Sequence, residues 1–305
     1  MHAAERPPGS RLRWGPGAQP PVEMMDARSF LGLEPSHNPM RWVLPVVPGI
    51  STGGNFLFGG CGLGAAIAAL EGTTERPVVW AAAQYLSYAR PPEVMDVDVT
   101  VAVSGRQTTQ ARAVGHVVDR EILTVNAALG QRPLQHEGQW SRMPKVQSPD
   151  DSPPRAYRLT NEDSIMRRLD VRLADGRDWT ELDGTPGTGQ CALWARMPEV
   201  LEMSAASLAI LGDYVPFGVG QALGQLAGGN SLDNTLRVVR LVPTEWVLID
   251  IHVHAIQNGF GHGLVHLWAE DGTLLATASQ SCIVRFWSEQ DREQIQREYE
   301  GQRND

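Results

Sequence analysis

The sequence predicts an α+β fold in which helices pack on a long antiparallel sheet, and three observations support this. Each half of the 305-residue chain contains an apolar helical segment and several strand-like segments. The strands follow one another directly and do not alternate with helices, which argues against a doubly wound nucleotide-binding fold. The two halves also end in similar segments, so we expect one structural unit to occur twice.

In the first half, a helix of small residues precedes four predicted strands. Residues 55–64 form a glycine-rich segment, and the helix follows over Ala65–Leu70. Apolar and polar residues alternate in 96–103, which is typical of a strand with one buried face. The predicted strands are 78–88, 94–103, 108–118 and 122–129, the last two separated by the polar turn 119–121.

The second half is expected to begin with a strand over Gln190–Met197. A helix with proline at its start is predicted over Pro198–Gly212. Strands are then predicted over 231–239, 246–255, 261–269 and 274–286. The internal similarity is clearest between Ala111–Gly130 and Gly261–Ser281, because each is an extended pair around an acidic turn.

Composition divides the chain into five parts. The proline-rich N-terminus is expected to be disordered and the polar C-terminus solvated. A cluster of turn formers over 147–154 lies near the midpoint and marks the break between two units. The predicted parts are a disordered segment 1–22, an N-terminal domain 23–146, a linker 147–189, a C-terminal domain 190–287 and a polar tail 288–305.

Charge and cysteine content narrow the class of protein. The chain has 26 basic and 35 acidic residues, a net charge of −9, which argues against nucleic-acid binding. No window approaches the roughly 18 apolar residues of a membrane span, and no secretory signal is evident. Cys61, Cys191 and Cys282 are widely spaced. We therefore expect a cytoplasmic protein without disulfides or structural zinc. Arginine replaces lysine at all basic positions except Lys145, which indicates a GC-rich, bacterial genome.

Two glycine-rich motifs point to chemistries that the rest of the sequence does not support. Gly49–Gly53 fits the G-x-S-x-G motif of serine hydrolases with Ser51 as nucleophile, but prolines weaken the preceding strand. Gly60–Ala65 fits a dinucleotide fingerprint, but the acidic residue expected about 20 residues later is missing. We favour a glycine-rich loop for the first motif and a closely packed helix for the second.

Four histidines, His252, His254, His262 and His266, lie in two predicted strands. His252 and His254 share a face and could bind zinc. The Asn258-Gly259 turn decides whether the other pair joins them. A two-residue turn, which Asn-Gly favours, leaves His262 and His266 on the opposite face. A three-residue turn gathers all four, but we expect scattered histidines and no metal site.

Asp213 is an unusual acidic residue, because it follows the apolar end of a predicted helix and precedes another apolar segment. A carboxylate at a helix C-terminus is opposed by the helix dipole. A partly buried carboxylate of this kind commonly has a catalytic task, such as accepting a proton from water. Ser231 and Gln280 lie in predicted strands and are unremarkable alone.

Together these segments resemble the TesB-like (type II) acyl-CoA thioesterases, which carry two hotdog domains in one chain. The resemblance spans roughly Asn55 to Arg285. It is carried by FGGCGLGAAIAAL in the first half, LGDYVPF around Asp213, NSLDNTLRV from Asn230, and EWVLIDI and EDGTLLATASQSCIVR near the C-terminus. It implies a double hotdog fold and hydrolysis of acyl-CoA without a cofactor or metal.

The resemblance also implies the catalytic groups. In the family a carboxylate, a hydroxyl and an amide hold one water against the thioester carbonyl, and these correspond to Asp213, Ser231 and Gln280. Helix N-terminal N–H groups near Gly59 and Gly60 are expected to bind the substrate carbonyl oxygen. The expected partner is acyl-CoA, with no nucleic acid or membrane, and the family's association through sheets implies a homo-oligomer.

The chain departs from the family pattern at a few positions. Asn234 replaces a usual histidine, and Leu236–Arg240 lacks the aromatic residue and histidine often found there. These departures mean that the resemblance does not assign the substrate.

Three other functions are alternatives to acyl-CoA hydrolysis. The first is a non-catalytic hotdog protein that binds an acyl thioester without hydrolysing it. The second is a hotdog hydratase, which is disfavoured because Asp213 has no histidine nearby, and the third is a serine hydrolase that uses Ser51.

Overall fold

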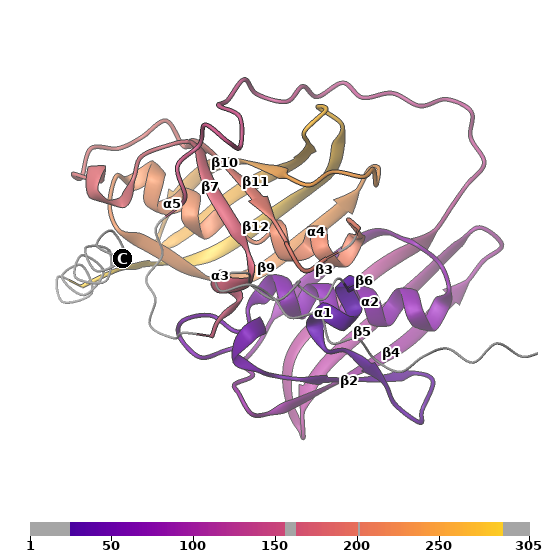
Figure 1. Ribbon diagram of the computed structural model, residues 1–305. Coiled ribbons are helices and arrows are strands. Elements are labelled where there is room, and N and C mark those ends of the chain that lie inside the picture. The colour runs from indigo at the N-terminus through magenta and orange to yellow at the C-terminus, as the bar shows by residue number, and fades with distance from the viewer. Residues whose placement is uncertain (1–24, 156–162, 201, 289–305) are drawn as a thin grey trace, which may run out of the picture.

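The computed structural model describes residues 25–155, 163–200 and 202–288. It contains one 12-stranded sheet with antiparallel pairing throughout and helices on its concave side (Figure 1). The fold is therefore the predicted α+β double hotdog. The predicted disordered segment 1–22, and all of the polar tail except Ser288, lie outside the described residues. None of the described helices is both long and apolar enough to cross a membrane.

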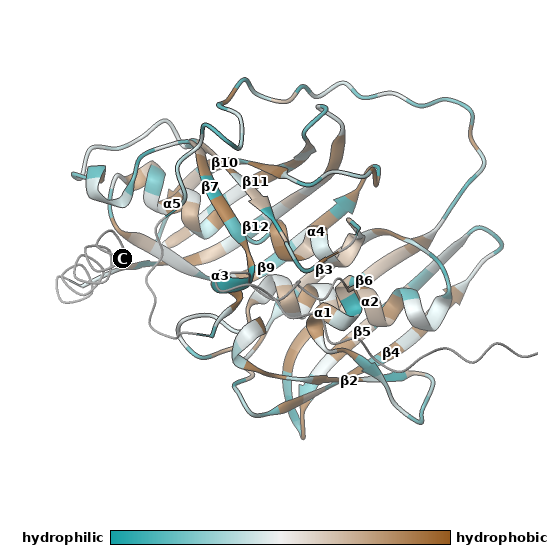
Figure 2. Ribbon diagram, in the orientation of Figure 1, coloured by the Kyte–Doolittle hydropathy of each residue, from teal (hydrophilic) through white to brown (hydrophobic). Residues whose placement is uncertain are grey.

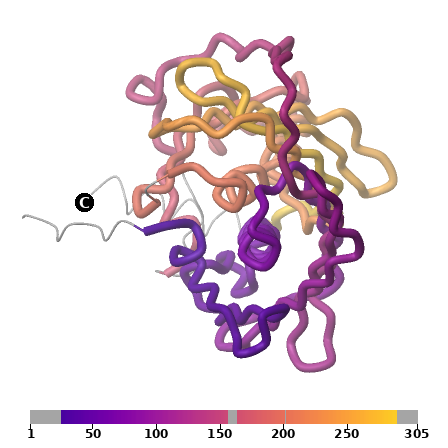
Figure 3. Tube along the Cα trace, turned by 90° about the vertical axis from the view of Figure 1, so that its right-hand side faces the viewer, coloured from indigo at the N-terminus to yellow at the C-terminus, as the bar shows by residue number. Residues whose placement is uncertain are grey.

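The first half wraps its strands around one long helix. Its elements are α1 (Ala27–Leu31), β1 (Glu34–Pro35), β2 (Arg41–Pro45), the 3-10 helix η1 (Pro48–Ile50), α2 (Gly59–Thr74), β3 (Val78–Tyr85), β4 (Val94–Ser104), β5 (Thr108–Val117) and β6 (Arg120–Gly130). Figure 3 shows α2 nearly end-on, with other segments of this half beside and below it and the second half above it. The helix begins before the predicted Ala65, because its glycines fit against close neighbours.

Between the predicted strands at 190–197 and 231–239, the second half contains two described helices where the sequence predicted one. Its elements are α3 (Ile165–Arg168), β7 (Asp170–Asp175), the 3-10 helix η2 (Trp179–Glu181), β8 (Gln190–Arg196), α4 (Ala205–Leu211), α5 (Val215–Leu223), β9 (Ala227–Val238), β10 (Val247–Gln257), β11 (Phe260–Ala269) and β12 (Leu274–Phe286). The predicted helix over Pro198–Gly212 is wrong at its start, because Ser204 caps α4 by accepting the N–H of Ser207. The segment 147–189, expected to be a linker, holds the edge strand β7.

The two halves join through both sheet and helices. The strand order is β1-β2-β4-β5-β6-β3-β9-β12-β11-β10-β8-β7, so β3 and β9 form the junction. Helix α2 packs on α4 through glycine: a Cβ atom at Gly60 would lie 2.9 Å from the Ala209 carbonyl oxygen, and one at Gly64 would lie 2.9 Å from that of Ala206. Hydrophobic residues line the strands, whereas peripheral loops are mostly polar (Figure 2).

The β10–β11 hairpin differs from the prediction in its register. Asn258 and Gly259 both have positive φ and form the predicted two-residue turn, with Gln257 facing Phe260. A β-bulge between Val253 and Ala255, however, shifts the pairing by one residue, so that Asp250 faces His266. The prediction that this turn leaves His266 on the face opposite His252 is therefore wrong.

Candidate active site

Asp213 lies in the short connection between α4 and α5 and is only 7% exposed. One carboxylate oxygen, Oδ2, accepts the N–H of Gly60 at 2.7 Å. Gly60 belongs to the first turn of α2, whose N–H groups and dipole favour a negative charge. The dipole of α4 disfavours the negative charge of Asp213 at its C-terminal end. The N-terminus of α2, from the other half of the chain, offsets this effect.

Ser231 and Gln280 reach the same carboxylate from the neighbouring strands β9 and β12. The Gln280 Nε2 group donates to Asp213 Oδ1 and also to Ser231 Oγ, the latter at 2.5 Å. Ser231 Oγ lies 3.4 Å from Asp213 Oδ1 and donates to it. The amide of Gln280 is held in turn by the N–H of Val215, which donates to Oε1 at 3.3 Å. The three residues implied by the family resemblance therefore form one hydrogen-bonded cluster.

The surroundings of Asp213 act on its pKa in opposite directions. Burial raises the pKa of the carboxyl above its ordinary value, since an ionised group loses hydration. Hydrogen bonds from Gln280, Gly60 and Ser231 lower it, because they stabilise the ionised form. The burial effect is the largest, so the pKa stays raised. Such a carboxylate is a stronger base than one in water, which suits it to accept a proton.

The cluster opens into a cavity of about 760 Å³. Asp213, Ser231 and Gly59 line it, together with Tyr85, whose hydroxyl donates to the Gly59 carbonyl oxygen at 2.9 Å. The remaining wall includes many apolar side chains, among them Phe56, Leu86, Phe217, Leu226 and Trp287. Apolar pockets with a few polar groups are typical of small-molecule sites.

The two glycines predicted to bind the substrate carbonyl differ in their position. The Gly60 N–H bonds to Asp213, and Gly60 is not part of the cavity wall. Gly59 does line the cavity. A side chain at Gly59 would clash, because its Cβ would lie 2.7 Å from Asp213 Oδ2. The sequence does not predict the role of Tyr85 or that of Gly59 in admitting Asp213, because these residues meet Asp213 only through the packing of α2 against both β3 and α4.

The two other motifs have structural roles. Ser51 is 1% exposed and its Oγ donates to the Val47 carbonyl oxygen at 2.8 Å, so it is not presented as a nucleophile. The glycines of the dinucleotide-like motif face protein: Gly62 approaches Leu123, while Gly60 and Gly64 approach α4. Both favoured interpretations, a loop and a closely packed helix, agree with these contacts.

Asn234, where the family usually has histidine, lies fully buried on β9 between Ala83 and Gln280. Neither atom of its side-chain amide has a hydrogen-bond partner among the described residues. The departure from the family pattern thus lies beside the cluster.

Comparison with known proteins identifies the family. Residues 144–284 match the family model described as the acyl-CoA thioesterase C-terminal domain. The chain is 33% identical to a candidate thioesterase from Novosphingobium aromaticivorans of known structure, with a TM-score of 0.74, and the match covers 82% of this chain and 97% of that one. The chain belongs to the TesB-like acyl-CoA thioesterase family. The predicted family resemblance is confirmed.

More distant structures share the thioesterase's fold. A hotdog protein of unknown function from Alicyclobacillus acidocaldarius is 18% identical with a TM-score of 0.73, and the match covers 86% of this chain and 98% of that one. The acyl-CoA thioesterase II TesB2 from Mycobacterium marinum is 20% identical with a TM-score of 0.68, covering 86% and 99%. No match was found among the curated proteins.

Proposed function

We propose that this thioesterase hydrolyses acyl-CoA to a carboxylic acid and free CoA, using a water molecule positioned by Asp213, Ser231 and Gln280. The observation that carries the proposal is the meeting of these side chains, from a helix junction and two strands, beside an apolar cavity. Membership of the family supports thioester hydrolysis as the reaction class.

The first step is attack by water on the thioester carbonyl carbon. Asp213 Oδ1 accepts one proton from the water while the oxygen forms its bond to carbon. Ser231 and Gln280 orient this water, because their polar atoms lie within hydrogen-bond reach of the same carboxylate oxygen. Holding the water in line with the carbonyl removes much of the entropic cost of bringing the two reactants together.

The second step is loss of the CoA thiolate. The tetrahedral intermediate carries a negative oxygen, which we assign to the Gly59 N–H because Gly59 lines the cavity at the start of α2. When the carbonyl reforms, the C–S bond breaks and the sulfur takes the proton held by Asp213. The carboxylate is then ready for another cycle, and no covalent acyl-enzyme forms.

Release of free thiol from a panel of acyl-CoAs, short to long, straight and branched, tests the proposal. Asp213→Asn should lower kcat by about 100-fold or more, since a general base contributes roughly 10²–10⁴-fold. Asp178→Asn is the matched control. Asp178 lines the same cavity and caps η2, and asparagine caps a helix equally well. This control should retain turnover.

Two results would contradict the proposal. Asp213→Asn with wild-type turnover would remove the carboxylate from the mechanism. Binding of acyl-CoA without turnover of any panel member would instead favour a non-catalytic acyl-thioester-binding protein. The panel also gives the chain-length preference.

A further inference from the structure

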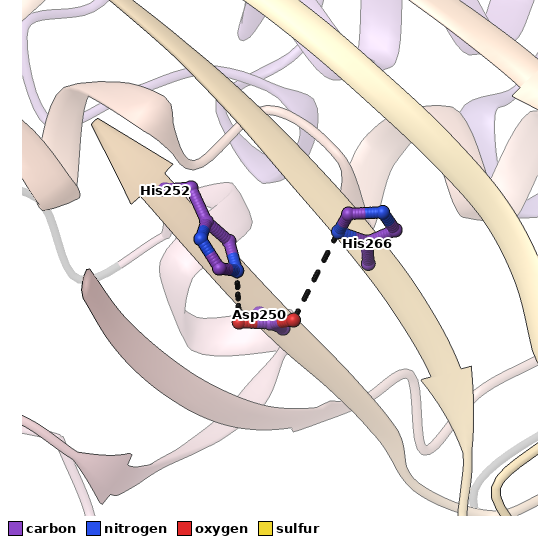
Figure 4. A group of neighbouring side chains, drawn as sticks. All are labelled: Asp250, His252 and His266. Atoms are coloured by element: carbon purple, nitrogen blue, oxygen red, sulfur yellow. Dashed lines mark ion pairs between the residues drawn. The ribbon is translucent and has the colours of Figure 1, made fainter. Parts of the chain in front are cut away.

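A cluster of two histidines and one aspartate lies on the outer face of the C-terminal half of the sheet (Figure 4). Asp250 and His252 are two residues apart on β10, and His266 faces Asp250 from β11. The neighbouring Ile251 points the other way, toward α5, where a Cβ atom at Gly218 would lie 2.7 Å from Ile251 Cγ2. The cluster is thus on the side of the sheet away from the thioesterase cavity.

The three side chains point their donor atoms at one place. His252 Nε2 lies 2.8 Å from Asp250 Oδ1, and His266 Nδ1 lies 3.9 Å from Asp250 Oδ2. All three donor atoms lie within 4.8 Å of one another. Two donors bound to one Zn²⁺ at about 2.1 Å each are at most about 4.2 Å apart, so a small rotation of an imidazole ring brings the whole set into range.

One atom of the cluster lacks the partner that its burial requires. His266 Nδ1 is buried and has no hydrogen bond among the described residues. Its 3.9 Å separation from the carboxylate is too long for a hydrogen bond, although a polar atom normally finds a partner when buried. A cation between this nitrogen and the carboxylate would bond to both.

Trp268 contacts both Asp250 and His266, as outer-shell residues contact the ligands in metal sites. Trp268 Nε1 donates to Asp250 Oδ2 at 3.4 Å, and the His266 ring stacks on the Trp268 indole with ring centroids 5.7 Å apart. Such contacts orient a ligating carboxylate and imidazole. The side chains of His252 and His266 are 31% and 20% exposed, which leaves a path for an ion and for a ligand from solvent.

We propose that Asp250, His252 and His266 bind a divalent transition-metal ion of the zinc class. Two imidazole nitrogens and one carboxylate oxygen are a donor set that Zn²⁺ accepts, with its remaining position open. The β-bulge at His254 creates the site, since it brings His266 opposite Asp250. A bound ion links β10 to β11 and is not needed for hydrolysis in the cavity.

The test measures Zn²⁺ binding to the tag-free full-length protein after treatment with a chelator. Equilibrium dialysis with metal analysis should give one Zn²⁺ per wild-type chain, and Co²⁺ should give the visible absorption of a site with nitrogen ligands. His266→Gln should weaken Zn²⁺ binding by about tenfold or more, because loss of even an outer-shell group costs that much. His262→Gln is the control, since His262 is exposed and lies outside the cluster.

The outcomes separate this proposal from the thioesterase mechanism. His266→Gln should keep wild-type thiol release and wild-type circular dichroism without metal, whereas Asp213→Asn should keep Zn²⁺ binding. Absence of Zn²⁺ binding by the wild-type protein overturns the metal site and leaves the hydrolytic proposal intact. Equal loss of binding in His262→Gln and His266→Gln also overturns it, because binding then comes from scattered surface histidines.

Discussion

At the scale of single residues, the ionisation of Asp213 controls the proposed reaction. Only the ionised carboxylate accepts a proton from water, so activity should fall as pH falls through its pKa. Burial raises that pKa above the ordinary 3.8. The acid limb of kcat/KM should therefore lie above pH 3.8. Steady-state thiol release across a pH series measures it, with an assay for CoA that works in acid.

A variant sharpens this prediction. Gln280→Glu places a second carboxylate beside Asp213, and repulsion between like charges should move the acid limb to higher pH. An acid limb at or below the ordinary aspartate pKa in the wild-type protein would show that Asp213 is not the group whose ionisation limits turnover.

Sequence reasoning at this scale succeeds where a residue conflicts with its local surroundings. Asp213 stands out because a carboxylate between two apolar segments must find partners elsewhere. Ser231 and Gln280 carry no such conflict, and only the resemblance to a family singled them out. Tyr85 has no local signal, since its role depends on Gly59, which is distant in the chain.

At the scale of elements, the glycines of α2 set the distance to α4. A methyl group at Gly60 or Gly64 would lie 2.9 Å from a backbone carbonyl oxygen of α4, so either alanine substitution forces the helices apart. We expect each to lower the free energy of unfolding by about 1–3 kcal/mol. Only Gly60→Ala should also reduce kcat, because only Gly60 donates to Asp213. Urea unfolding and thiol release measure both effects, and equal kcat in the two variants would contradict the role assigned to Gly60.

The elements that sequence reasoning missed depend on contacts between distant segments. Helix α5 contains Pro216, Gly218 and Gly220, which weaken a helix prediction, yet Gly218 is required where α5 meets Ile251. The β-bulge at His254 has no strong local signal either, and it decides which histidines share a face. The pairing of consecutive strands as hairpins was predictable, because polar turns separate segments in which apolar and polar residues alternate.

At the scale of the whole molecule, a continuous sheet joins two similar halves. The repeat was visible in the sequence, but the pairing of β3 with β9 was not, because it links residues far apart in the chain through backbone hydrogen bonds that carry no side-chain signature. This junction places Asn234 of the second half opposite Ala83 of the first half, three residues along β9 from Ser231. The proposed site is therefore shared: the second half supplies Asp213, Ser231 and Gln280, and the first half supplies the N-terminus of α2.

Because sheet and helices both cross the junction, the two halves should unfold together. Urea unfolding followed by tryptophan fluorescence and by far-UV circular dichroism should give one coincident transition. Ala82→Pro removes a backbone donor from β3, where Ala82 pairs with both Asn126 and Thr235, and should lower the midpoint of both signals equally. Ala102→Pro lies at the β-bulge between Val101 and Val103 and should change the midpoint less. Two separate transitions would show that the halves are independent domains, in which case the geometry of the shared site would not depend on the junction.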